Sequence, residues 1–89
     1  MTPRSEALRH NRDIFADTVS YVLRAQFAAQ SAIQRNVRIG HVKAGLMLVL
    51  LEEWGIVEPA KGSRARDVLV PKEGLEGILS EVRGGDTTP

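Results

Sequence analysis

The sequence predicts an α+β fold, a winged helix-turn-helix (three helices and a two-stranded β-hairpin wing) with an extra C-terminal helix. Three helical apolar patterns come first, and two short β-prone runs separated by a basic, turn-rich segment follow. A last amphipathic pattern adds the extra helix. We expect a flexible tail over residues 1–12, a winged-helix domain over 13–71, the added helix over 72–83 and a disordered tail over 84–89.

The first two helices are predicted from apolar residues on one face. The first pattern runs from Ile14 to about Gln26, and Asp13 can cap its N-terminus. Ser31 can cap a short second helix, whose apolar positions end at Val37. Gly40 then permits a tight turn, because glycine tolerates a positive φ.

The third helix is expected to run from His41 to Trp54 and to stop at Gly55, the residue type favoured just beyond a helix C-terminus. Its sequence, HVKAGLMLVLLEEW, is apolar nearly all round, although a helix that reads DNA should be polar on its outer face. Trp54 is expected to cover the core rather than to stack on a base. The predicted core stripe of this helix comprises Ala44, Met47, Leu48 and Leu51.

The β-prone runs IVEPA and DVLVP are separated by KGSRAR and predict the hairpin with a basic tip, ending at Pro71. The segment KEGLEGILSEVR then predicts an amphipathic fourth helix. Its apolar positions follow i, i+3, i+4, i+7 spacing and are Leu75, Ile78, Leu79 and Val82.

Composition narrows the class of protein. The chain has 89 residues, no cysteine and a formal net charge of +1, so it lacks a disulfide framework and a global basic field. Its longest apolar run, LMLVLL, is too short to cross a bilayer, and its first residues do not form a signal peptide. We therefore expect a cytoplasmic location. No metal-ligand spacing or nucleophile motif is present, so we predict no metal, no cofactor and no enzymatic activity.

One segment resembles a known family. IQRNVRIGHVKAGLMLVLLEEWGIVEPAKGSRARDVLV is similar to the gamma domain of FtsK-type DNA translocases, where a segment like LQRRxRIGYxRAARLxxxLEExGIVGPxxGSKPREVL is characteristic. The resemblance covers roughly residues 14 to 70 and implies sequence-directed binding of duplex DNA without catalysis. Because no motor domain is present, we expect a small stand-alone protein of bacterial or phage origin. The matching residues are Gln34, Arg35, Arg38, Ile39, Gly40, Ala44, Glu52, Gly55, Ile56, Val57, Pro59, Gly62, Ser63, Arg66, Val68 and Leu69.

The sequence departs from the family on the third helix. The resemblance implies base-reading positions that typically hold Asn, Arg and Glu, but here they hold Val42, Leu46 and Val49. At 100° per residue these three side chains lie within about 60° of one another and form a single stripe. Bidentate Arg and Asn contacts each contribute about 1–3 kcal/mol of discrimination between bases, whereas Val and Leu can contact only thymine methyls. We therefore expect an altered or weak sequence preference.

Polar and basic residues near the turn motif and the wing are the candidates for contact with DNA. For the basic residues, the alternative is an ordinary solvated surface. His41 can instead be a plain exposed or capping histidine, and Ser63 can simply shape the turn. The candidate DNA-binding residues are Arg35, Arg38, His41, Lys43, Lys61, Ser63, Arg64 and Arg66.

The aliphatic stripe (Val42, Leu46 and Val49) leaves three interpretations open: cover by the last helix, an interface with a protein or a second copy, or direct contact with thymine methyls. An exposed apolar patch usually marks an interface. The first hypothesis is thus a small protein that binds double-stranded DNA, and the alternative is a protein-interaction or dimerisation module. Neither includes a membrane or a small-molecule substrate. The candidate protein interface comprises Val42, Leu46, Val49, Leu75, Ile78 and Leu79.

Overall fold

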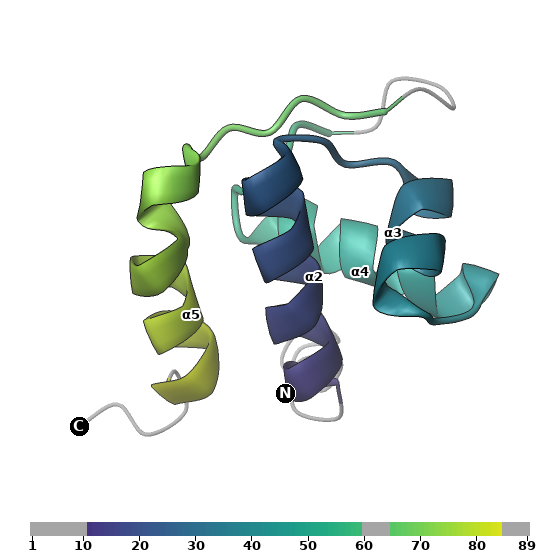
Figure 1. Ribbon diagram of the computed structural model, residues 1–89, viewed down its shortest axis with the longest axis horizontal. Helices are drawn as coiled ribbons and strands as arrows, with labels where there is room; N and C mark the ends of the chain where they lie inside the picture. The colour runs from purple at the N-terminus through teal and green to yellow at the C-terminus, as the bar shows by residue number, and fades with distance from the viewer. Residues whose placement is uncertain (1–10, 60–64, 85–89) are drawn as a thin grey trace.

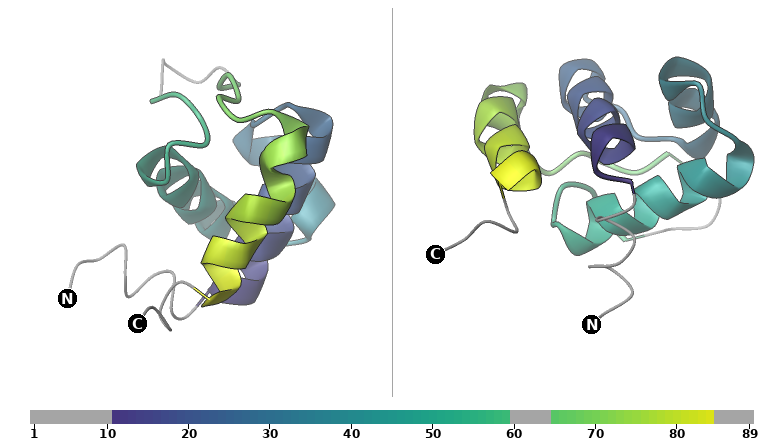
Figure 2. Two further views of the ribbon diagram at one scale, coloured as in Figure 1. Left: turned by 90° about the vertical axis from the view of Figure 1, so that its left-hand side faces the viewer. Right: turned by 90° about the horizontal axis from the view of Figure 1, so that it is seen from below.

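The computed structural model describes residues 11–59 and 65–84. Helices α5, α2 and α3 stand in a row, and α4 crosses one face of that row (Figure 1, Figure 2). The central helix α2 contacts α3, α4 and α5, and α3 also contacts α4. No helix in these two ranges is both long and apolar enough to cross a membrane. The elements in chain order are α2 (Arg12–Ala25), α3 (Gln30–Val37), α4 (His41–Glu53), the 3-10 helix η1 (Lys72–Gly74) and α5 (Leu75–Gly84).

The four helical patterns are confirmed as helices, but two predicted caps are wrong. α2 begins at Arg12, so Asp13 lies inside its first turn, and the N-cap position belongs to Asn11. α3 begins at Gln30, one residue before the predicted cap Ser31. Neither helix has a side-chain capping bond at its N-terminus. The apolar periodicity predicted the helical segments, but each observed N-cap lies two residues before the predicted one.

The turn between α3 and α4 is made by a different residue from the one predicted. Arg38 adopts the left-handed conformation, with φ 64° and ψ 52°, and its backbone N–H bonds to the carbonyl of Gln34. Gly40 is extended, with φ −75° and ψ 171°, so the prediction of a positive φ at Gly40 is wrong. The prediction for the other end of α4 is confirmed, since Gly55 has φ 75° directly after the last turn.

The predicted β-hairpin wing is wrong, because none of the residues in 11–59 and 65–84 belongs to a β-strand. Two isolated antiparallel bridges stand in its place, Val57 with Val68 and Ala28 with Arg66. On the α4 side the first pairing does not lengthen into a ladder. The N–H of Ile56 donates to the carbonyl of Leu51 at 2.9 Å, so it is not available to the carbonyl of Leu69. The described part of the chain is thus helical, with paired extended segments, rather than α+β.

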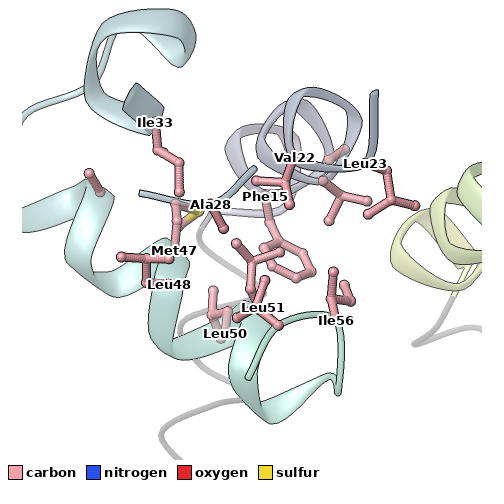
Figure 3. Packing of buried hydrophobic residues seen from close by; sticks show 14 of the residues in the cluster. Phe15, Val22, Leu23, Ala28, Ile33, Met47, Leu48, Leu50, Leu51 and Ile56 are labelled. Carbon is pink, nitrogen blue, oxygen red and sulfur yellow. The ribbon is translucent and has the colours of Figure 1, made fainter. Parts of the chain in front are cut away.

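The core lies between α2 and α4. Figure 3 shows Phe15 and Val22 facing Met47 and Leu51, and all four side chains are fully buried. The predicted core stripe of α4 is confirmed, since all four of its members are buried. Trp54 packs against this core, as predicted, and its ring centroid lies 5.4 Å from that of Phe15. Complete burial of one large apolar side chain contributes about 1.5–3 kcal/mol to the free energy of folding.

The last helix packs along α2 at one end of the row and does not cover the outer face of α4 (Figure 1). Val82 is fully buried at this contact. Three further residues of α5, Leu75, Ile78 and Leu79, are partly buried against the core. The apolar face of α5 therefore finds its packing surface on α2.

Candidate nucleic-acid interface

Two residues of the aliphatic stripe of α4, Val42 and Val49, lie on the face of that helix that points away from the core, whereas Leu46 packs partly against the core. Val42 is 85% exposed and Val49 is 48% exposed, while Leu46 is partly buried. The helical period places the stripe roughly opposite the buried Ala44 and Leu51. The last helix does not cover the stripe, because α5 packs on α2. The sequence of α4 is apolar nearly all round for two reasons: one face of the helix packs in the core, and the opposite face carries exposed aliphatic side chains.

Three cations surround the beginning of α4. Arg35 lies in the last turn of α3, Arg38 forms the left-handed turn, and Lys43 lies in the first turn of α4. All three side chains are exposed, and neither arginine forms an ion pair within the described residues. The free N–H groups of a helix N-terminus add a partial positive charge at the same place. This end of α4 is suited to an anion such as a phosphate group.

Gln30 connects the two helices of the turn motif, a role that the sequence did not reveal. Its amide nitrogen donates to the backbone carbonyl of His41 at 2.9 Å. The same nitrogen lies 3.3 and 3.4 Å from the two ring nitrogens of the exposed His41. Gly45 allows this close approach, since a Cβ there would lie 3.2 Å from the Gln30 nitrogen. The first residue of α3 is thereby held against the first two turns of α4.

Lys43 is linked to the start of α2. Its ammonium donates to the side-chain oxygen of Asn11 at 2.9 Å. An ammonium carries three donor protons, so two stay available for another acceptor. The bond orients Lys43 without removing its charge from the exposed surface.

Arg66 is placed differently from the other cations. Its guanidinium lies 3.1 Å from a carboxylate oxygen of Glu52, and the arginine side chain is only 15% exposed. Its backbone N–H donates to the carbonyl of Ala28 at 2.8 Å. The structure thus ties this predicted DNA-binding residue to the end of α4 and to the α2–α3 connection. The other predicted wing residues, Lys61, Ser63 and Arg64, lie outside the described residues.

The candidate interface residues of the last helix do not continue the stripe. Leu75, Ile78 and Leu79 lie against the core beside α2, whereas Val42 and Val49 lie on the outer side of α4. Across residues 11–59 and 65–84, there is also no cluster of three His, Cys, Asp or Glu side chains that could hold a metal ion.

Comparison with known proteins confirms the resemblance. The model of the Ftsk gamma domain family matches residues 9–71. The DNA translocase FtsK of Mycobacterium tuberculosis strain H37Rv is 44% identical over 72 residues, which cover 81% of this chain and 9% of that protein. The DNA translocase FtsK of Streptomyces coelicolor is 39% identical over 79 residues (89% and 9%). That of Corynebacterium glutamicum is 42% identical over 88 residues (92% and 10%). The chain spans about a tenth of the length of these curated relatives.

Proposed function

The chain belongs to the FtsK gamma domain family, and from that premise we propose that it binds duplex DNA without catalysing a reaction. Binding places the exposed face of α4 in the major groove, as a helix-turn-helix does with its second helix. One observation carries the proposal beyond the family match. The cations Arg35, Arg38 and Lys43 gather at the N-terminal end of the helix that has an exposed outer face.

Phosphate contacts supply the affinity in this proposal. Arg35 and Arg38 are the main contacts, because each is exposed and has no carboxylate partner in the described part of the chain. Lys43 and His41 add contacts from the first turn of α4, and Lys61, Ser63 and Arg64 add contacts from the segment that follows Pro59. Such contacts position a protein on the duplex but carry little sequence information.

Arg66 acts as a positioning residue in this proposal. Its partly buried guanidinium is engaged by Glu52, and its backbone by Ala28. It holds the segment 65–70 (the return segment) against the end of α4 (the reading helix), so its contribution to DNA affinity is indirect.

The sequence preference is altered relative to the family. Val42, Leu46 and Val49 stand where Asn, Arg and Glu are typical, so the hydrogen bonds of the usual reading residues are missing. The support is the exposure of Val42 and Val49 on the outer face of α4.

Fluorescence anisotropy of a labelled mixed-sequence duplex tests the proposal. The double variant Arg35→Ala/Arg38→Ala should bind at least about tenfold more weakly at low salt, because two phosphate contacts are lost. The matched control is Arg24→Ala/Arg83→Ala, which removes two exposed arginines from α2 and α5. Equal losses in the two double variants would indicate a non-specific charge effect and would count against docking through the turn motif.

A second candidate function is a protein-interaction or dimerisation module. The observation that favours it is the 85% exposure of Val42 on an aliphatic helix face. In that case Val42→Asp should dissociate a complex that wild-type protein forms with itself, as measured by sedimentation velocity. A wild-type protein that stays monomeric at all concentrations argues against self-association.

A further inference from the structure

We propose that the aliphatic stripe of α4 recognises the C5 methyl groups of thymines in the major groove, so that the preferred sites contain A·T pairs. This inference rests on the proposed binding of duplex DNA and names the base feature that is read. Methyl recognition is different from a loss of sequence preference, because the aliphatic side chains themselves discriminate between bases.

The stripe has dimensions that fit a short run of base pairs. Val42 and Val49 are seven residues apart, which corresponds to about 10 Å along a helix that rises 1.5 Å per residue. Base pairs of B-DNA are spaced by about 3.4 Å, so this length covers about three base-pair steps. Leu46 lies midway and is partly buried, which leaves the two valines as the outermost groups. The stripe is therefore long enough for two or three methyl contacts.

The chemistry of the stripe selects one base feature. Valine and leucine side chains have no hydrogen-bond donor or acceptor, and the thymine methyl is the apolar group that unmodified base pairs present in the major groove. Adenine N7 and N6 and thymine O4 are polar, as are guanine O6 and N7 and the cytosine amino group, so the cost of desolvating polar groups falls on both kinds of base pair. The methyl contact is the difference, and it favours A·T pairs over G·C pairs.

Charge complementarity identifies DNA as the partner of this surface. Arg35, Arg38 and Lys43 stand at the N-terminal end of the helix that carries the stripe, in the place where phosphates flank a helix in the major groove. A stable protein interface buries about 800 Å² on each partner. The exposed parts of Val42 and Val49, with the partly buried Leu46 between them, form a much smaller patch. A narrow apolar strip beside cations matches a groove floor lined by methyls better than a second protein.

Replacing thymine by uracil tests the inference, because uracil keeps the pairing and O4 and lacks only the methyl. Anisotropy would compare a labelled mixed-sequence duplex rich in A·T pairs with its uracil counterpart. We expect about a fourfold weaker affinity for each contacted methyl that is removed, the effect of one buried methylene-sized group. In the converse arm, 5-methylcytosine should strengthen binding to a G·C-containing duplex by a similar factor per methyl.

The double variant Val42→Ser/Val49→Ser is the control for changes in DNA shape. Both positions are exposed, so the variant should fold, which circular dichroism checks. It should bind both duplexes with the salt dependence of wild type and without a preference between thymine and uracil. Equal wild-type affinity for the two duplexes overturns methyl recognition and leaves DNA binding intact. If the wild-type protein binds neither duplex, the proposed DNA binding is wrong, and so is the proposed methyl recognition. A dimer abolished by the double variant would instead assign the stripe to a second copy and also overturn the inference.

Discussion

The guanidinium of Arg66 lies 3.1 Å from a carboxylate oxygen of Glu52, so an ion pair joins the return segment to the last turn of α4. The backbone N–H of the same arginine donates to the carbonyl of Ala28 at 2.8 Å. One residue therefore connects the reading helix, the return segment and the connection between α2 and α3. In the described residues, these contacts and the bridge of Val57 with Val68 hold the return segment against its neighbours, as a β-ladder would in a wing.

Variants of this pair should differ in their effect on stability. Glu52→Gln is expected to lower the free energy of unfolding by less than about 1 kcal/mol, because that carboxylate is 41% exposed and the pair is screened by solvent. Arg66→Ala should cost more, since it also removes the packed stem of the side chain. Urea denaturation followed by Trp54 fluorescence measures both. A larger loss in Glu52→Gln than in Arg66→Ala would contradict this assignment.

Arg38→Gly should separate stability from binding. Arg38 has φ 64°, a conformation that costs a non-glycine residue about 1–2 kcal/mol, and glycine removes that strain. The greater freedom of glycine in the unfolded chain offsets part of the gain, so we expect a change between zero and about 1 kcal/mol of stabilisation. Duplex affinity should fall at the same time, because a cation is lost. Strong destabilisation in urea would show that the Arg38 side chain has a structural role.

Gly45→Ala should show coupling to Gln30. Alanine is about 1 kcal/mol better than glycine inside a helix, but its Cβ would lie 3.2 Å from the Gln30 side-chain nitrogen. The expected gain is therefore small in wild type and larger in a Gln30→Ala background, with a coupling of at least about 0.5 kcal/mol. A double-mutant cycle of thermal or urea unfolding measures it. Additive effects would mean that the two helices tolerate the added methyl without adjustment.

Val82→Ala should destabilise the fold without weakening DNA binding of the folded protein. Val82 is fully buried where α5 meets α2, and removal of two methyl groups there costs about 2 kcal/mol. Because α5 does not cover the outer face of α4, duplex affinity at a low temperature should match wild type. The exposed neighbour Ser80→Ala is the control and should change neither quantity. Tighter DNA binding by Val82→Ala would instead indicate that α5 obstructs the interface.

The helices could be predicted from the sequence because their signal is local. Apolar spacing from Ile14 onward and the apolar face around Ile78 placed α2 and α5 correctly, and Gly55 marked the end of α4. The caps could not be predicted in the same way. Asp13 and Ser31 have suitable side chains, but the first turn of each helix is fixed by packing of its apolar face against the other helices.

The wing failed as a prediction because β-propensity describes single residues and not the pairs they form. Val68 and Leu69 are β-prone, yet a ladder needs successive partners on the facing segment. On that segment the N–H of Ile56 is engaged by the carbonyl of Leu51 at the end of α4, so the bridge of Val57 with Val68 stays isolated, and the backbone of Arg66 pairs with Ala28. Which segment an extended run pairs with is a tertiary property that local patterning does not encode.

The candidate site was partly predictable. The position of Val42 and Val49 opposite the core face followed from the helical period, but their exposure did not, because cover by the last helix was still open. The partners of Lys43 and Arg66 did not, because Asn11 and Glu52 are 32 and 14 residues away in sequence. The bond from Gln30 to His41 joins two helices and spans 11 residues. Its one signal in the sequence is Gly45, a glycine inside a helix.

The salt dependence of duplex affinity tests the central claim most directly. Each phosphate neutralised on B-DNA contributes about −0.9 to the slope of log affinity against log salt concentration. With Arg35, Arg38 and Lys43 in contact, the wild-type slope should be about −3 or steeper, and the Arg35→Ala/Arg38→Ala variant should be shallower by about 2. A wild-type slope near zero, or no binding at low salt, would contradict a phosphate-contacting DNA-binding domain.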